Sequence, residues 1–177
     1  MSSNQQFHVT LEEATRAKWP HEIFLINLVF NHIFIFIVSM LMVKSFPMAP
    51  ALVVVISVSI ILYIVIKSKQ VAKGGDSIFV KLNWEVCAKR NTWFVMLLTV
   101  TLSIIFGGLQ LSQAMHWSKI NTMALIGGVG LLPFMVVLLL LVVLGNDSVH
   151  LARSGRMAKG MAEKAKSLGL EPIEQTE

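Results

Sequence analysis

Four long apolar runs constrain this chain more than any other feature of its sequence. The first, Ile23 to Val43, contains no charged side chain and would reach about 30 Å as an α-helix, the thickness of a bilayer's hydrocarbon core. Similar uncharged runs follow at about residues 49–66, 92–109 and 123–144. The chain is 55% hydrophobic and has a mean hydropathy of +0.70, which is too high for an ordinary soluble domain. The sequence therefore predicts an all-α integral membrane protein with four transmembrane helices, arranged as two antiparallel hairpins.

The N-terminal segment, residues 1–22, is predicted to lie outside the hydrocarbon core. Residues 1–6 form a polar tail that offers nothing to pack. Thr10 and Glu13 have the spacing of a capping box, in which each side chain accepts from the other residue's backbone N–H. A short amphipathic helix should follow, and Trp19-Pro20 should close it, because the proline suits the first turn of the next helix and the tryptophan a membrane interface.

Two more helices are predicted outside the apolar runs. In the loop 67–91, Asp76 can cap a basic amphipathic helix over Ser77 to Ala88, which we expect to lie in the headgroup layer between the second and third spans. A docking surface for a cytoplasmic partner is the alternative. The tail, residues 146–177, is expected to form a basic helix that Gly169 ends.

The basic residues indicate an orientation. The N-terminal segment, the middle loop and the C-terminal tail contain two, six and five of the fifteen Lys and Arg residues, whereas the opposite side has only Lys44 and Lys119. Because cytoplasmic loops carry the excess of Lys and Arg, both termini and the middle loop should be cytoplasmic, and we expect the bacterial inner membrane. The expected partners are anionic lipid headgroups and other membrane protein subunits, with no nucleic acid.

Polar side chains within the first span form the main candidate site. Asn27 and Asn31 are four residues apart and share one helix face, and His32 lies about 100° round from Asn31. Polar groups at membrane depth often mark a pathway or a binding site. The alternative, which we favour, is interhelical hydrogen bonding to residues such as Ser57, Thr99 or Ser103, because the spans lack the charged relay of an ion-coupled transporter.

Two features of the fourth span and its surroundings are weaker candidates. Pro133 follows three glycines and should kink the helix, either as a gating hinge or, as we favour, as a packing bend. His21 and His150 flank the first and fourth spans on the same side, so they could bind a haem b or a metal, although interface histidines usually meet water and headgroups. Cys87, expected to be half-buried, excludes an intrachain disulfide and a cysteine-based zinc site because it is the single cysteine. No other metal site is expected.

The sequence contains no recognisable catalytic motif: P-loop, HExxH, GxSxG and EF-hand patterns are all absent. We therefore expect no catalytic residues and a non-catalytic multi-pass protein that serves as an accessory, assembly or scaffold subunit of a larger membrane complex. The alternative is a self-contained small transporter, channel or immunity-type protein that uses the Asn27, Asn31 and His32 face. A haem-binding membrane protein is the third interpretation.

Overall fold

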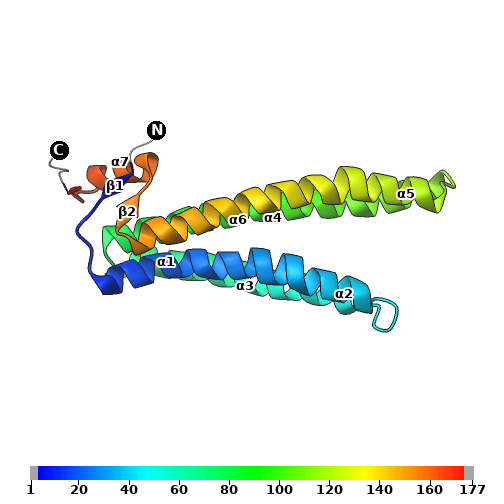
Figure 1. Cartoon of the computed structure of the whole chain (residues 1–177), viewed down its shortest axis with the longest axis horizontal. Helices are drawn as coiled ribbons and strands as arrows, with labels where there is room; N and C mark the ends of the chain where they lie inside the picture. Colours follow the sequence, from blue (N-terminus) through cyan, green and yellow to red (C-terminus); the bar gives the residue numbers. More distant parts are fainter. Residues whose placement is uncertain (1–3, 174–177) are drawn as a thin grey trace. The chain divides into compact units, whose positions relative to one another are not determined.

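A computed structural model describes residues 4–173, and these residues confirm the all-α class and the four helices long and apolar enough to cross a membrane (Figure 1). Two of the four long helices contain a π-helical stretch. In chain order the elements are β1 (Gln5–Gln6), α1 (Leu11–Leu25), π-helical η1 (Ile26–Ile35), α2 (Phe36–Met42), α3 (Ala49–Lys73), α4 (Ile78–Ala114), α5 (Lys119–Leu125), π-helical η2 (Ile126–Leu131), α6 (Leu132–Arg153), β2 (Arg156–Met157) and α7 (Lys159–Ser167).

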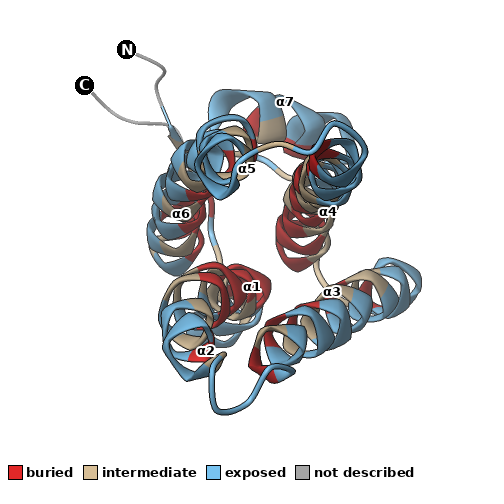
Figure 2. Cartoon of the chain, turned by 90° about the vertical axis from the view of Figure 1, so that its right-hand side faces the viewer, coloured by how far each residue is buried: buried red, intermediate tan, exposed pale blue. Residues whose placement is uncertain are grey.

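The apolar runs leave large hydrophobic side chains uncovered, as a lipid-facing helix does. On the first long helix the exposed residues include Phe30, Phe34 and Leu41, the last of which is 78% exposed. Figure 2 shows the same division on α3, with buried residues along one side and exposed residues along the other. Apolar surface of this extent needs a hydrocarbon environment, so the bilayer replaces part of the protein core. The positions at which the bilayer boundaries cross the helices stay a prediction.

The chain divides into two compact units: residues up to Lys89 together with those from Val142 onward, and Arg90–Leu141. In the second unit, α4 and the fourth long helix run antiparallel. The rings of Phe94 and Phe134 lie 6.4 Å apart between centroids, and Ser112 is hydrogen-bonded to Thr122 near the other end. A Cβ added at Gly130 would meet Ile104 at 3.5 Å, so the glycine permits a close helix contact.

Pro133 is the second residue after the π-helical stretch η2. There the Leu132 N–H donates to the carbonyl of Gly127, five residues back, instead of four. Because Pro133 cannot donate to Val129, the wider turn accommodates the missing hydrogen bond and the helix continues into α6. The structure thus has a π-helical stretch next to Pro133, and the predicted kink of the helix axis stays a prediction.

The predicted capping box is confirmed, and the predicted break after it is wrong. The Glu13 N–H donates to Thr10 Oγ1 at 3.2 Å, and the Thr10 N–H donates to Glu13 Oε2 at 2.8 Å. The helix then continues through Pro20, which is buried inside α1. An interior proline costs a helix about 3 kcal/mol. The buried stripe formed by Ala14, Ala17, His21 and Phe24 extends across Pro20, and its packing offsets that cost.

The separate interfacial helix predicted for the middle loop does not exist as such. Helix α3 extends to Lys73 and α4 begins at Ile78, so only Gly74 to Ser77 connect them. The predicted helix is the first part of α4, because nothing in its sequence interrupts the helix before the third apolar run. Ser77 takes the capping position expected of Asp76: its Oγ accepts from the Val80 N–H at 3.5 Å, while Asp76 forms an ion pair with Arg16.

The tail also differs from its prediction. Helix α6 continues through Gly145 to Arg153, and Gly155, with φ of 67°, turns the chain into β2. Strand β2 pairs antiparallel with β1 in the N-terminal tail, which was expected to pack against nothing. The predicted tail helix is reduced to α7. Gly169 ends it as predicted, through a Schellman motif in which the Leu170 N–H donates to Ala165 and the Gly169 N–H to Lys166.

Residues near both ends of the described range belong to a small hydrophobic core that we call the terminal cap. Phe7 and Met157 are almost fully buried in it, together with residues from α1, the end of α3, the start of α4, the end of α6 and α7. The members are Phe7, Ala17, Val71, Phe79, Val80, Leu82, Trp84, Ala152, Met157, Ala162 and Ala165. The helices thus extend beyond their apolar runs and pack there as an ordinary soluble core does.

Candidate functional site

The π-helical stretch η1 brings three polar side chains to one face. Asn27, Asn31 and His32 are buried, with 0%, 1% and 5% of their surface exposed. In an α-helix, residues five apart are separated by about 140°, so His32 would point away from Asn27. A π-helix turns about once every 4.4 residues, which places both the fourth and the fifth following residue within about 50° of the first. The structure thus groups the three predicted residues more tightly than an α-helix would.

Hydrogen bonds tie this cluster to α3. Asn27 Nδ2 donates to Ser57 Oγ at 3.2 Å, and Asn31 Nδ2 donates to the Val53 carbonyl oxygen at 2.9 Å and to Asn27 Oδ1 at 3.1 Å. Ser57 is one of the partners expected from the sequence. It lies near the centre of the apolar run 49–66, about 12–13 Å from either end along the helix axis. The contact of the cluster with Ser57 therefore lies near the middle of the apolar run of α3.

The hydrogen bond of His32 identifies its tautomer. His32 Nδ1 lies 2.9 Å from the Asn27 carbonyl oxygen, which can only accept, so Nδ1 must carry a proton. Asn31 Nδ2 also approaches Nδ1, at 3.5 Å, but with the proton on Nδ1 this approach joins two donors and is not a hydrogen bond. The His32 ring is thus held by a backbone carbonyl of its own π-helix, that of Asn27, one π-helical turn earlier in the chain.

One atom of the cluster has no partner. Asn31 Oδ1 is fully buried and has no hydrogen bond to any residue between 4 and 173, whereas both N–H groups of the same amide are used. A buried acceptor without a donor costs about 1–3 kcal/mol. The hydrogen bonds to α3 and between the two asparagines account for the other amide atoms, and they do not account for this oxygen.

The two predicted haem or metal ligands are in different environments. His21 is fully buried on α1, and its Nε2 lies 3.2 Å from Asn83 Oδ1. The Asn83 amide nitrogen donates to the Phe79 carbonyl, so its oxygen faces His21 and accepts from Nε2. His150 is exposed on α6. A haem with two axial histidines needs both rings on one cavity, and the buried and exposed positions do not provide it.

No group of three or more His, Cys, Asp or Glu residues that could hold a metal occurs between residues 4 and 173. Cys87, expected to be half-buried, is fully buried, and its thiol donates to the Pro20 carbonyl at 3.2 Å. A reactive thiol needs exposure, and Cys87 has none, so its burial favours a packing role for this side chain over a reactive one.

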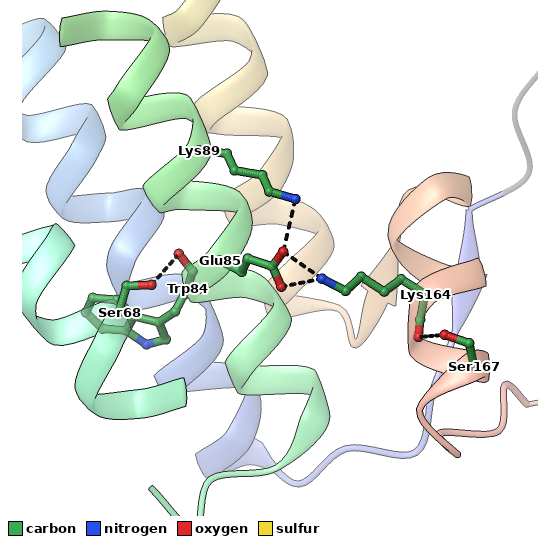
Figure 3. A network of polar contacts seen from close by, with 6 residues as sticks. All are labelled: Ser68, Trp84, Glu85, Lys89, Lys164 and Ser167. Carbon is green, nitrogen blue, oxygen red and sulfur yellow. Dashed lines mark hydrogen bonds and ion pairs between the residues drawn. The ribbon is translucent and has the colours of Figure 1, made fainter. Parts of the chain in front are cut away.

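A further polar network joins α7 to α4, and sequence reasoning did not find it (Figure 3). Glu85 accepts from Lys164 Nζ with both carboxylate oxygens at 2.6 Å and from Lys89 at 3.0 Å. Hydrogen bonds from Lys164, and then from Lys89, hold the pKa of the Glu85 carboxyl below its ordinary value. The spacing of Glu85 and Lys89 could have indicated their pair, but nothing in the sequence links Glu85 to a residue 79 positions away.

Comparisons of the chain with protein-family models, with curated proteins and with solved structures give no match.

Proposed function

We propose that this chain is a non-catalytic accessory, assembly or scaffold subunit of a larger membrane complex. The observation that carries the proposal is how the intramembrane polar groups are used. Asn27 donates to Ser57 on α3, Asn31 donates to Val53 on α3 and to Asn27, and His32 donates to the backbone of its own helix. Groups used in this way stabilise a helix pair and do not line a path for a substrate.

The terminal cap supports the same proposal. Buried residues near both ends of the described range and from all four long helices form a packed platform outside the apolar runs. Its surface is basic, since Arg153, Arg156, Lys159 and Lys166 are exposed and form no ion pair with another described residue. By the positive-inside rule we assign this platform and both termini to the cytoplasm, and the protein to the bacterial inner membrane.

Purification in a gentle detergent from the native host tests the proposal. We expect a stoichiometric partner to co-purify and to identify the process in which the chain takes part. A chain with Lys159→Glu and Lys166→Glu on α7 should release a partner bound at the cap, and Lys44→Glu with Lys119→Glu serves as the matched charge control. Recovery of the wild-type chain alone, as a monomer or homo-oligomer, would overturn the accessory role.

A transporter, channel or immunity-type role is the second candidate, because two observations favour it. First, Asn31 Oδ1 is a buried acceptor without a donor among the described residues. Second, η1 is π-helical over ten residues. Most π-helical segments are single turns, and they occur frequently at functional sites. In this role Asn31 and His32 would contact the transported species, and Pro133 with the adjacent π-helical turn would act as the hinge.

Substitutions separate the two candidates. In the transport role, Asn31→Ala and His32→Ala each abolish the function of the protein in cells, so that the cells behave like cells in which the gene is deleted. The protein itself remains at its normal level in the membrane. In the accessory role, the same variants lower the free energy of unfolding by about 1 kcal/mol and leave complex formation unchanged.

A further inference from the structure

The last turns of α3 present three exposed lysines without compensating charge. Lys67, Lys69 and Lys73 are all exposed, and none forms an ion pair with another residue in the described range 4–173. Helix α3 contains no acidic residue. The first carboxylate that follows, Asp76, is already paired with Arg16. The end of α3 is therefore a site of uncompensated positive charge.

The same exposed side of α3 is apolar directly before these lysines. Leu62, Tyr63 and Ile66 are 53%, 43% and 54% exposed. At about 100° per residue, Leu62, Ile66, Lys69 and Lys73 fall within an arc of about 60°, whereas Lys67 lies near Tyr63, about 160° from Lys69. Ile64 and Val71 are buried on the opposite side. The face of Leu62 and Ile66 therefore changes from apolar to basic between Ile66 and Lys69, within a single turn.

This order of an apolar surface followed by positive charge matches the acyl chains and the phosphate of a phospholipid. An acyl chain can lie on Leu62 and Ile66, the Tyr63 ring can reach the interface, and the lysine stems can extend along the helix to a phosphate. An acidic soluble protein would match the lysines, but it would leave the adjacent apolar side unmatched. We propose that the end of α3 is a binding site for an anionic phospholipid, whose phosphate is held by Lys69 and Lys73, with Lys67 adding positive charge beside Tyr63.

The experiment compares two lipids bound to the purified full-length protein. Phosphatidylglycerol and phosphatidylcholine are titrated separately into the detergent-solubilised protein, and bound lipid is counted by native mass spectrometry. Each basic residue near an anionic surface strengthens binding about fivefold, so Lys67→Gln, Lys69→Gln and Lys73→Gln together should weaken phosphatidylglycerol binding about a hundredfold. Phosphatidylcholine binding should stay unchanged. Glutamine has nearly the helix propensity of lysine, so these variants keep α3 intact.

A second triple variant provides the matched control. Arg156→Gln, Lys159→Gln and Lys166→Gln remove the same charge from exposed residues of β2 and α7, which are not part of an apolar run. This variant should bind phosphatidylglycerol as the wild type does. Equal weakening in both triple variants would mean diffuse charge attraction, and unchanged binding in the α3 variant would mean that these lysines do not contact the lipid. Either result would refute the proposed lipid-binding site at the end of α3.

Two competitors exclude the other sources of negative charge. Inorganic phosphate and polyglutamate, each at the charge concentration of the bound lipid, should not displace phosphatidylglycerol. Displacement by phosphate would mean that the lysines bind a free anion, and displacement by polyglutamate that the surface recognises an acidic polypeptide. Both results contradict the lipid site, and neither bears on the proposed accessory role.

Discussion

The hydrogen bond between Asn27 and Ser57 permits a quantitative test of the interhelical cluster. Asn27 Nδ2 donates to Ser57 Oγ at 3.2 Å, both residues are fully buried, and they come from different helices. Measured couplings of such bonds in a membrane protein average about 0.6 kcal/mol and reach about 1.7 kcal/mol. Because both side chains are excluded from lipid and water, we expect a coupling energy of 0.6 kcal/mol or somewhat more.

A double-mutant cycle isolates this energy. The free energy of unfolding is measured in mixed micelles for the wild type, Asn27→Ala, Ser57→Ala and the double variant. Asn27→Ala alone should cost about 1–3 kcal/mol, because it also leaves an amide N–H of Asn31 without its acceptor. The cycle cancels that additional cost, which is present in both variants lacking Asn27.

Ser59 provides the control for the cycle. Its hydroxyl is exposed and donates to the Val55 carbonyl of its own helix at 2.9 Å. The Asn27/Ser59 coupling should therefore be zero within about 0.3 kcal/mol, the usual error of additivity for independent sites. An Asn27/Ser57 coupling no larger than the Asn27/Ser59 coupling would refute the assignment of the cluster to helix pairing.

Three further predictions concern the terminal cap. Phe7→Ala should cost the cap about 3–5 kcal/mol because it empties a fully buried site, and limited proteolysis should then cut within α7 while the long helices stay protected. Gly155→Ala should be more destabilising than Gly169→Ala in thermal unfolding: both residues have positive φ, but only at Gly155 would the new Cβ approach Val9 within 2.8 Å. The Glu85 ion pairs should stabilise the cap at neutral pH, and this contribution should disappear as the pH falls from about 4.3, the unfolded pKa, through the lower folded pKa. Unfolding measured against pH should show this loss in the wild type and not in Glu85→Gln, and an identical pH dependence of both would contradict it.

Local signals in the sequence predict the structure correctly where it depends on neighbouring residues alone. The Thr10 and Glu13 capping box and the Gly169 helix end involve residues at most five positions apart, and both are confirmed. The predicted helix end at Pro20 is wrong because that prediction rests on a local signal alone. Proline is a strong local signal for a helix end, but the buried residues on either side of it belong to a stripe that packs against other helices.

The candidate site was only partly predictable. The residues Asn27, Asn31 and His32 stood out because polar groups are rare at membrane depth. Their common face depends on the π-helical geometry of η1, which the α-helical spacing of the sequence does not reveal. The pairing of Asn31 with the Val53 backbone also had no signal, because every residue offers the same carbonyl group.

The sequence alone determined the membrane class and the four long helices, because hydropathy is a property of each side chain and accumulates along a run. Only the tertiary structure decided that the helices extend past those runs and that Phe7 and Met157, from opposite ends of the chain, share the core of the terminal cap. That core depends on contacts between residues far apart in the sequence, each of which has little apolar surface to bury by itself. The free energy gained by burying them appears only when all of the segments are present together.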